Sequence, residues 1–362
     1  MTFSQKIEQL KTFAYEIGIN KVGVCRAEAA ASYPFFERWL DEKKHGDVSV
    51  GVEDAKSSVN RGMTYLLRRR EARKHPNSIL RNVKSLMIVA LNYDSVNPPT
   101  QTTPTLSQPE QFGVVAEYAR GCDYHDVVRA KLKRLEQKHR ELFPEAASRI
   151  VADSAPILER EYALRAGLGR LGRNTLLLNE QCGSRFFLGV LLSTAEFYAE
   201  DLQQKNAEMP LSCLPREKSC EHCGRCVAAC PIGALDEPYQ LDARKCLNYW
   251  LIEFTGNEIP SAIRQRVGNR LFGCDTCASV CPFNQRNAKP SFAEISDEDL
   301  RRMSLRRQLE HGCLSIACIE SLDEAAFHEQ FFGTPIFRLG LTNLKRNADV
   351  VKENGLNVDF CD

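Results

Sequence analysis

The chain has 362 residues, and its 48 lysines and arginines nearly balance its 47 aspartates and glutamates, for a formal net charge of +1. This length predicts two or three domains, and the balanced charge excludes a protein that holds nucleic acid through an overall basic field. No apolar stretch is long enough to cross a membrane and no export signal opens the chain, so we expect a cytoplasmic protein.

The first two hundred residues alternate apolar, β-rich runs with helical patterns, beginning with an amphipathic helix in residues 1–19. Residues 126–142 have apolar positions at helical spacing, and residues 156–167 open with proline and close on glycine, as helices often do. The alternation predicts an α/β domain over residues 1–200. Strands are expected at residues 21–25, 85–93, 112–119, 149–153 and 185–194.

The second half of the chain divides into a cysteine-rich segment and a tail. A polar linker at residues 200–219 leads into the cysteines, and we expect an α+β, ferredoxin-like domain over residues 201–288. Residues 289–362 are expected to form a short helical C-terminal segment, with its clearest amphipathic pattern at residues 297–310.

Eight of the fifteen cysteines fall between residues 220 and 281. The run "CEHCGRCVAACP" (220–231) has the spacing of bacterial ferredoxins, in which three thiolates hold one [4Fe–4S] cluster and the fourth, before proline, binds another. A shorter version, "CDTCASVCP" (274–282), follows, and Cys246 supplies its missing thiolate. The predicted ligands are Cys220, Cys223, Cys226 and Cys281 for the first cluster, and Cys230, Cys246, Cys274 and Cys277 for the second.

A pair of zinc sites is the alternative, because zinc ribbons also use CxxC pairs. Zinc, however, needs only four ligands per site and does not account for a CxxCxxCxxxCP run followed by a second Cys-Pro. The other cysteines are expected to be small buried hydrophobic residues. They are Cys25, Cys122, Cys182, Cys213, Cys313, Cys318 and Cys361.

Two clusters form an electron path, and its acceptor is not evident from motifs. The glycine-dense segment "AGLGRLGRN" (166–174) follows a predicted helix, whereas a dinucleotide-binding fingerprint follows a strand. The electrons must therefore reach another cofactor or a partner protein.

Several segments together resemble the epoxyqueuosine reductase family, cobalamin-dependent enzymes that complete queuosine synthesis on tRNA. The similar segments occur in the family's order, from near residue 10 to the tail. They are "GMTYLLRRREARKHP" (62–76), "YARGCDYHDVVRAKL" (118–132), "DSAPILEREYALRAGLGRLGRNTLLLNEQCGSRFFLGVLLST" (153–194), "DARKCLNYWLIEFTGNEIP" (242–260) and "GCDTCASVCPFNQ" (273–285).

The resemblance implies an oxidoreductase that converts the epoxide of epoxyqueuosine, at the wobble position of tRNA, into the alkene of queuosine. The implied substrates are the tRNAs with GUN anticodons, which carry Asp, Asn, His and Tyr. Cobalamin bound in the N-terminal domain would receive electrons from a low-potential donor through the two [4Fe–4S] clusters. The net reaction consumes two electrons and two protons. A monomer without a membrane partner is expected.

The resemblance also assigns site residues. Asp153 is the expected proton donor to the leaving epoxide oxygen. A helix N-cap role for Asp153 or Ser154 is the structural alternative, and a helix start would lower the pKa of Asp153, whereas enclosure by cofactor and substrate would raise it. Arg160, two helical turns on, is a candidate to orient Asp153. Candidate cobalamin contacts are Tyr118, His125, Gly167, Gly169, Gly172, Asn174, Gly183 and Ser184.

Two features depart from the family or extend beyond it. Residues 47–61 form an insertion, which a surface loop tolerates, and the helical tail is shorter than in members that end in HEAT-like repeats. Local basic clusters are candidate phosphate contacts, with a solvated helix face as the alternative for each. They are Arg68, Arg69, Arg70, Arg73 and Lys74; Arg301, Arg302, Arg306 and Arg307; and Lys345 with Arg346.

Three alternative functions remain open from the sequence. A corrinoid reductive dehalogenase shares cobalamin and two clusters, but such enzymes are typically exported and lack the "YARGCDYH" context. A ferredoxin-type electron carrier would leave the first two hundred residues without a role. A cobalamin-processing protein would bind a corrin without binding tRNA.

Overall fold

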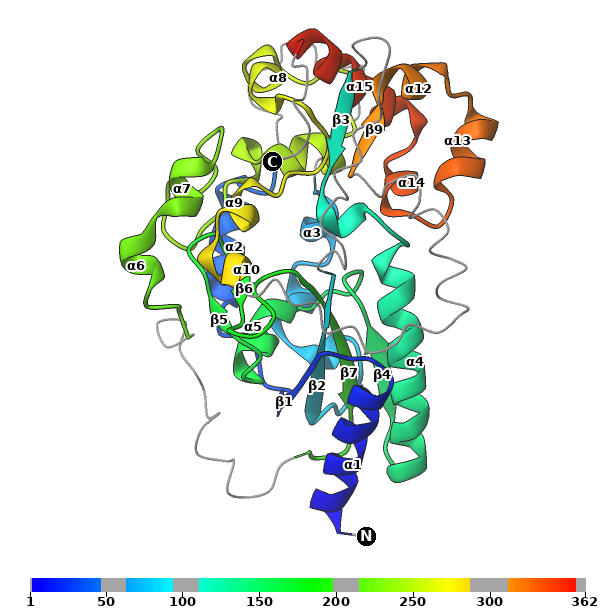
Figure 1. Ribbon diagram of the computed structural model, residues 1–362. Coiled ribbons are helices and arrows are strands. Elements are labelled where there is room, and N and C mark those ends of the chain that lie inside the picture. Colours follow the sequence, from blue (N-terminus) through cyan, green and yellow to red (C-terminus); the bar gives the residue numbers. More distant parts are fainter. Residues whose placement is uncertain (1, 47–62, 94–110, 198–214, 287–311, 356–362) are drawn as a thin grey trace.

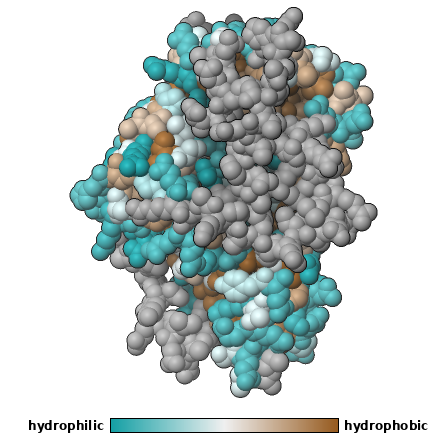
Figure 2. Space-filling model, in the orientation of Figure 1, coloured by the Kyte–Doolittle hydropathy of each residue, from teal (hydrophilic) through white to brown (hydrophobic). Residues whose placement is uncertain are grey.

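The structure is a computed structural model that describes residues 2–46, 63–93, 111–197, 215–286 and 312–355. Among these residues no helix is both long and apolar enough to cross a membrane. The insertion, the amphipathic segment at residues 297–310 and the second basic cluster lie outside the described residues. Figure 2 shows that the lower part of the molecule, around the N-terminal helix, has a mainly hydrophilic outer face.

The elements appear in chain order in Figure 1. The first group is α1 (Phe3–Glu16), β1 (Lys21–Arg26), α2 (Tyr33–Asp41), α3 (Tyr65–Arg68), η1 (Glu71–Lys74), η2 (Pro76–Ser78), β2 (Ser85–Asn92), β3 (Phe112–Val115), η3 (Glu117–Ala119), α4 (Tyr124–Leu142), β4 (Ser148–Val151), α5 (Glu159–Arg165), β5 (Arg170–Leu171), β6 (Leu177–Leu178) and β7 (Phe186–Ser193). The second is α6 (Cys220–Cys223), α7 (Arg225–Ala229), η6 (Ala243–Lys245), η7 (Tyr249–Glu253), α8 (Ser261–Val267), β8 (Arg270–Phe272), α9 (Thr276–Ser279) and α10 (Pro282–Arg286). The last is β9 (Cys313–Ser315), α12 (Ile316–Ser321), α13 (Glu324–Phe331), α14 (Pro335–Leu339) and α15 (Leu341–Asn354).

Four strands form the larger sheet in the order β1-β2-β7-β4, and each neighbouring pair is antiparallel. The mixture of helices and strands agrees with the expectation, but strand direction corrects it, because an α/β domain has a mainly parallel sheet. The connections explain the difference. β2 and β7 are neighbours although β3, α4, β4 and α5 all lie between them in the chain, and so long an excursion can return a strand in either direction.

Most predicted elements are present, with shifted ends. The strand expected over 112–119 ends at Val115, because the 3-10 turn η3 follows it. The strand expected over 149–153 ends at Val151, which leaves Asp153 beyond the sheet. The helix expected over 156–167 begins only at Glu159, so the proline at 156 lies before its first turn.

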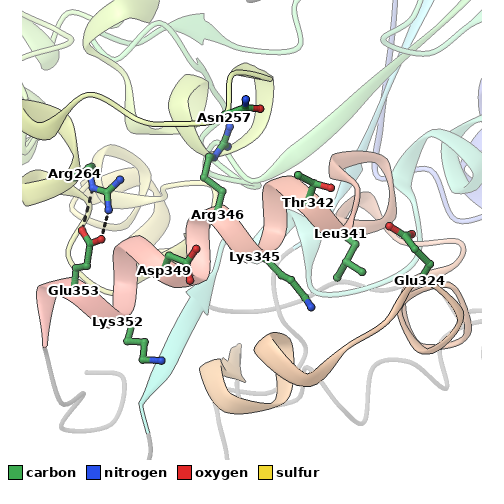
Figure 3. Close-up of a pocket in the computed structure, with 10 residues that line it drawn as sticks. All are labelled: Asn257, Arg264, Glu324, Leu341, Thr342, Lys345, Arg346, Asp349, Lys352 and Glu353. Carbon is green, nitrogen blue, oxygen red and sulfur yellow. Dashed lines mark hydrogen bonds and ion pairs between the residues drawn. The ribbon is translucent and has the colours of Figure 1, made fainter. Parts of the chain in front are cut away.

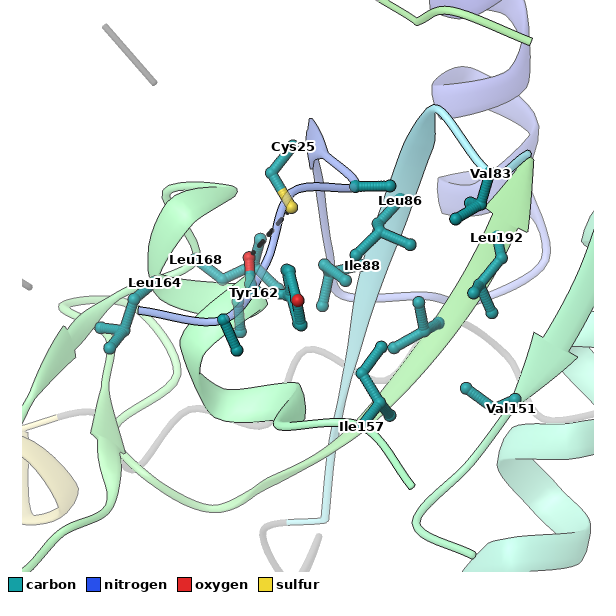
Figure 4. Close-up of a cluster of buried hydrophobic side chains, with 14 of the residues drawn as sticks. Cys25, Val83, Leu86, Ile88, Val151, Ile157, Tyr162, Leu164, Leu168 and Leu192 are labelled. Carbon is teal, nitrogen blue, oxygen red and sulfur yellow. Dashed lines mark hydrogen bonds between the residues drawn. The ribbon is translucent and has the colours of Figure 1, made fainter. Parts of the chain in front are cut away.

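Both faces of the larger sheet are buried. Alternate residues of β2 point to opposite faces, so Leu86 and Ile88 join the cluster under α5, whereas Met87 and Val89 join the cluster under α1 and α4. Figure 4 shows the first cluster. There the Cys25 thiol, fully buried, contacts the backbone carbonyl of a residue in α5 at 3.5 Å. The expectation of a small buried side chain is confirmed for Cys25.

Among the other non-motif cysteines, Cys182 is buried as expected, but the expectation is wrong for Cys318, which is exposed. Cys122 and Cys313 are partly buried. Cys213 and Cys361 lie outside the described residues.

A second, three-stranded sheet connects distant parts of the chain. β3 pairs in parallel with β8 and antiparallel with β9. It therefore takes one strand from each of the three segments that we predicted as domains, and it lies beside the C-terminal helices (Figure 1). The division at residues 200 and 288 stays a prediction.

The C-terminal helices confirm a helical tail, but one of their basic residues is not available for phosphate. Arg346 in α15 is 7 % exposed, and its guanidinium donates to the carbonyls of Phe254 (2.9 Å), Gly256 (2.7 Å) and Trp250 (3.3 Å). A buried arginine with such partners is structural. The prediction that Arg346 contacts phosphate is therefore wrong.

Candidate active site and cysteine centre

Asp153 lies two residues beyond β4 in an uncommon backbone conformation. Its φ is +56°, in the left-handed region, which aspartate and asparagine tolerate better than most residues. Its backbone N–H donates to Oε1 of Glu159 at 2.9 Å. The carboxylate is 54 % exposed. The turn thus presents the Asp153 side chain outside the sheet, beside the first turn of α4.

The start of α4 provides the partners of this carboxylate. Tyr124 donates its hydroxyl to Oδ2 of Asp153, and Nε2 of His125 lies 3.2 Å from the same oxygen. Asp123, the N-cap residue of α4, contacts the other ring nitrogen of His125, Nδ1, at 2.7 Å. Arg338 of α14 pairs in turn with Asp123. Charged groups therefore alternate in sign from the C-terminal helices to Asp153.

The contacts among these side chains keep Asp123, His125 and Asp153 in their charged forms. The hydrogen bond with His125 lowers the pKa of Asp153, although burial opposes it. Burial acts to raise the pKa of Asp123, but the contacts with His125 and Arg338 outweigh it and bring that pKa to about 2. Burial likewise acts to lower the pKa of His125, but both carboxylates raise it to about 9. At neutral pH His125 is therefore an imidazolium between two carboxylates.

Glu159 and Arg160, at the start of α5, act on Asp153 differently. Burial, helped by the negative charge of Asp153, raises the pKa of Glu159 to about 8. Two neighbouring carboxyls therefore differ in protonation, as acid and base groups of enzymes often do. Arg160 donates to the backbone carbonyl of Thr175 at 2.6 Å, and its charge contributes to lowering the pKa of Asp153.

Tyr124 contacts Asp153, and two further tyrosines, Tyr65 and Tyr118, lie within reach of its charge. Burial raises the pKa of each of Tyr65, Tyr118 and Tyr124, and the negative charge of Asp153 adds to each shift. Tyr65 is half-exposed (49 %), whereas the ring of Tyr118 packs between Tyr124 and β8. Glu253 also lies near, since burial and Asp153 raise its pKa. Aromatic and acidic groups from several segments thus converge on one carboxylate.

Three of the candidate cobalamin contacts have partners in the second cysteine motif. The buried amide of Asn284, in α10, donates to the Ser184 hydroxyl at 2.9 Å and accepts from the Ser184 N–H at 2.7 Å. A Cβ on Gly183 would lie 2.2 Å from the amide oxygen of Asn284. Asn174 donates to the carbonyl of Cys277 at 3.3 Å. These contacts dock the cysteine motif onto the β5–β7 region.

The other candidate glycines of that region have local structural roles, one at a helix end and two at the pairing of β5 with β6. Gly167, with φ +75°, follows the end of α5, where a left-handed residue commonly closes a helix. A Cβ on Gly169 would lie 2.4 Å from the carbonyl oxygen of Leu178, and one on Gly172 would crowd the side chain of the same residue at 2.8 Å. Both therefore allow β5 and β6 to pair closely.

The first predicted cluster set is brought together from two distant motifs. Burial raises the pKa of Cys220, and the thiols of Cys281 and Cys223 add to the shift. Cys226 behaves in the same way, with Cys220 and Cys281 as its neighbours. Cys281 of the second motif thus lies with the three thiols of the first.

The second set converges similarly. Burial raises the pKa of Cys246 to about 11, and Cys274 and Cys230 are the neighbouring thiols. The pKa of Cys277 is raised by burial and by Cys246, Cys274, Cys226 and Cys230. Because Cys226 belongs to the first set, the two sets are adjacent.

Two kinds of metal centre make different demands on the cysteine thiols. Among the described residues, no three histidine, cysteine, aspartate or glutamate side chains converge on one point as a single metal ion requires. A zinc ion would need four ligands within about 2.3 Å of one centre. Thiolates that bind the corners of a cubane stand farther apart. The Ala234 N–H donates to the Cys230 thiol at 3.3 Å, a contact of the kind that tunes such clusters.

A hollow along α15 is separate from this chemistry (Figure 3). Two of its charged side chains, Arg264 and Glu353, pair with each other, with Nε and Oε2 3.0 Å apart. The hollow is lined by Asn257, Arg264, Glu324, Leu341, Thr342, Lys345, Arg346, Asp349, Lys352 and Glu353.

Comparisons with known families agree with this geometry. Residues 219–284 match a family model described as "4Fe-4S double cluster binding domain", and residues 73–154 match one described as "Epoxyqueuosine reductase QueG, DUF1730". An epoxyqueuosine reductase of Salmonella typhimurium is 33 % identical over 98 % of this chain and 81 % of its own length. The chain belongs to the epoxyqueuosine reductase family. It is an oxidoreductase with a domain for two iron–sulfur clusters.

Other epoxyqueuosine reductases support this assignment. The enzyme of Vibrio cholerae is 32 % identical over 98 % of this chain and 85 % of its own length. A crystal structure of an epoxyqueuosine reductase with an epoxyqueuosine-modified tRNA-Tyr stem loop has the same fold, with a TM-score of 0.76 and 24 % identity over 98 % of this chain and 82 % of that one. The Bacillus subtilis enzyme gives a TM-score of 0.74 at 24 % identity, over 98 % of this chain and 82 % of that one.

The resemblance predicts Asp153 as the proton donor, but it does not indicate the residues that contact it. Asp123 and Tyr124 are part of "YARGCDYH", and the signal for them is their position in the cap and first turn of α4. Glu159 and Arg338 carry no local signal, because only the folded chain brings them near. Asn284 could have been noticed as the polar residue shortly after the second Cys-Pro.

Proposed function

We propose that this chain reduces the epoxide of epoxyqueuosine, at the wobble position of tRNAs with GUN anticodons, to the alkene of queuosine. Electrons from a low-potential donor would pass through two [4Fe–4S] clusters to cobalamin. The observation that carries the proposal is the partly exposed acid Asp153, held by α4 in the same fold as the crosswise cysteine sets. The identity of 32–33 % to epoxyqueuosine reductases over nearly the whole chain supports it.

The proposed cluster ligands follow from the grouping of the thiols. Cys220, Cys223, Cys226 and Cys281 would bind the first cluster. Cys230, Cys246, Cys274 and Cys277 would bind the second. Eight thiolates serve two cubanes, four ligands each.

Aromatic side chains near Asp153 are the ones we propose to contact the corrin of cobalamin. Tyr65 of α3 is a large, half-exposed side chain (49 %) whose phenol lies within reach of the Asp153 charge. Tyr65 and Tyr118 are the residues we propose to hold the corrin, whose cobalt supplies single-electron chemistry when bound. The docking contacts of Asn174, Gly183 and Ser184 would fix the cluster domain beside it.

The chain's own contribution to the reaction is the proton. The epoxide oxygen leaves as water, so a positioned acid must protonate it. Asp153 is the proposed donor, and its exposed carboxylate can reach a bound nucleotide. The wobble base lies in a single-stranded loop, from which it can enter a pocket without breaking a duplex.

Basic residues of α3 are the proposed phosphate contacts. Arg68 and Arg69 are exposed and have no ion-pair partner among the described residues. Arg68 ends the short helix that Tyr65 begins, and Arg69 follows directly as its C-cap, so a tRNA loop at Asp153 would pass beside them. Arg70, in contrast, pairs with Glu37 and Asp41.

The test is an anaerobic single-turnover assay. The protein is reconstituted with iron, sulfide and cobalamin, reduced chemically and mixed with tRNA that carries epoxyqueuosine, and the nucleosides are resolved by mass spectrometry. We expect the loss of one oxygen mass, with the rate reduced at least about 100-fold in Asp153→Asn and no product without cobalamin. Asp323→Asn is the matched control, since it makes the same substitution at the N-cap of α13, where asparagine caps equally well. An unchanged nucleoside with fully reduced cofactors would refute the proposal.

A further inference from the structure

The contacts of His125 place two carboxylates on one imidazole. We infer that Asp153 and His125 form a single acid unit, in which His125 stores the proton that Asp153 passes to the epoxide oxygen. This inference rests on the proposed function, and it assigns to His125 a role in proton transfer in place of the cofactor contact predicted for it.

The geometry requires a doubly protonated ring. Nδ1 of His125 lies 2.7 Å from Oδ1 of Asp123, and Nε2 lies 3.2 Å from Oδ2 of Asp153. A neutral imidazole has only one N–H and could donate to only one of these carboxylates, whereas an imidazolium donates to both. The ring is 10 % exposed, so water cannot easily replace either partner.

Asp153 alone is poorly suited to hold a proton at rest. Its Oδ2 receives the Tyr124 hydroxyl and faces the His125 ring, and hydrogen bonds to a carboxylate favour the anion. The exposed side of the carboxylate nevertheless faces outward, where substrate can bind. Asp153 is therefore placed to transfer a proton and His125 to keep one.

The other charged groups around His125 come from three elements. Asp123 caps α4, Arg338 belongs to α14, and Glu159 begins α5. Glu159 is the competing store, because burial keeps its carboxyl protonated near neutral pH. Its Oε1, however, accepts the backbone N–H of Asp153 and does not contact the Asp153 carboxylate. His125, and not Glu159, is therefore the proton store in direct contact with the Asp153 carboxylate.

The reaction consumes two protons and two electrons for each epoxide. The proton moves from Nε2 of His125 to Asp153, and from the resulting carboxylic acid to the epoxide oxygen as a C–O bond breaks and an O–H bond forms. His125, now neutral, takes a second proton from solvent and passes it through Asp153 to the hydroxyl, which leaves as water when the second C–O bond breaks. The two electrons come from the low-potential donor of the reductase. The product is the alkene and one molecule of water.

The test is the pH profile of the single-turnover rate. In the unchanged protein the rate should fall as pH rises through about 9, where His125 loses its proton. His125→Gln keeps a donor near Asp153 but stores no proton, so its rate should be at least about 100-fold lower at pH 7.5 and much closer to normal at pH 5.5. A purely structural role would lower the rate by the same factor at every pH, and that result would overturn the inference.

The fall of the rate at alkaline pH is the alkaline limb of the pH profile. Two further variants should move this limb along the pH axis in opposite directions. Asp123→Asn removes a carboxylate that raises the pKa of His125, so the limb should move down by about 1–2 pH units. Arg338→Gln removes a positive charge that lowers it, so the limb should move up. Glu159→Gln retains the acceptor for the Asp153 N–H and should leave the limb in place. If Glu159→Gln moves the limb and His125→Gln does not, Glu159 is the store and the inference is wrong.

A titration of the loaded protein separates this inference from the proposed function. Carbon-13 NMR of the histidine rings, with His125 assigned by its absence in His125→Gln, should show titration near pH 9. Titration near the ordinary histidine pKa of about 6.5 would refute the inference that His125 stores the proton, even if the enzyme reduces epoxyqueuosine on tRNA. A titration near 9 in a protein that leaves epoxyqueuosine unchanged would refute the proposed function and retain the proton pair.

Discussion

At the scale of single residues, Asp153 combines a functional carboxylate with an unfavourable backbone. A residue with a Cβ pays about 1–2 kcal/mol for the left-handed region, whereas glycine does not. Asp153→Gly should therefore be more stable than Asp153→Ala by about 1 kcal/mol, and neither should have an acid at this position. Denaturant unfolding of the two variants measures the difference. Equal stability would mean that residue 153 does not keep its φ of +56° in solution.

His139 gives a residue-scale prediction about pH. Its ring is fully buried, with Nε2 2.8 Å from the Ser193 hydroxyl, and burial lowers its pKa to about 4. The unfolded chain, with a histidine pKa of about 6.5, then binds a proton that the folded chain does not accept. Stability should fall by up to about 3 kcal/mol between pH 6.5 and 4.

His139→Gln is the comparison for that effect, because glutamine can still contact the Ser193 hydroxyl but does not titrate. Unfolding free energies of both proteins, measured under nitrogen at pH 7 and pH 4.5, should converge as pH falls. A constant difference between them would show that His139 is not the group responsible.

At the scale of elements, the contact of α10 with the residues just before β7 should determine how well the first cluster is bound. Gly183→Ala would place a Cβ 2.2 Å from the Asn284 amide at a φ of +63°, and Cys281 lies directly before α10. We expect less iron per protein and weaker cluster absorbance. Gly167→Ala is the matched control, since it has φ +75° but open space around the added Cβ, and it should keep its iron. Equal iron loss in both variants would assign the effect to backbone strain.

The elements also show what the sequence can and cannot predict. Local apolar patterns were sufficient for β1, β2, β7 and α4, whereas the pairing of the two cysteine motifs stays a prediction from their spacing. Strand direction was not predictable, because it depends on how long connections return. The contacts of Asp153 with α4 and the contact of Gly183 with Asn284 also join residues far apart in the chain, and no local sequence pattern indicates them.

At the scale of the whole molecule, a chain of nearly zero net charge must bind tRNA through local cations. Removing both exposed arginines of α3 (Arg68→Gln with Arg69→Gln) should weaken tRNA binding and reduce the slope of log K against log salt by about 0.7–0.9 per side chain. Arg70→Gln is the control, because Arg70 is already paired with Glu37 and Asp41. Binding titrations at several salt concentrations measure the slopes. An equal change for Arg70→Gln would argue against a specific contact.

The three-stranded sheet has a consequence for how the protein is made. β3 leaves the ribosome early, but its partners β8 and β9 are synthesised about 160 and 200 residues later. Until then β3 has two open edges, and the first cysteine motif lacks the thiol of Cys281. Nascent chains are therefore expected to wait, incompletely folded, until almost all of the protein has been translated. The four-stranded sheet, by contrast, is complete once Ser193 has been made, so a cell short of iron would hold chains with a folded first sheet and unfilled cysteine sets.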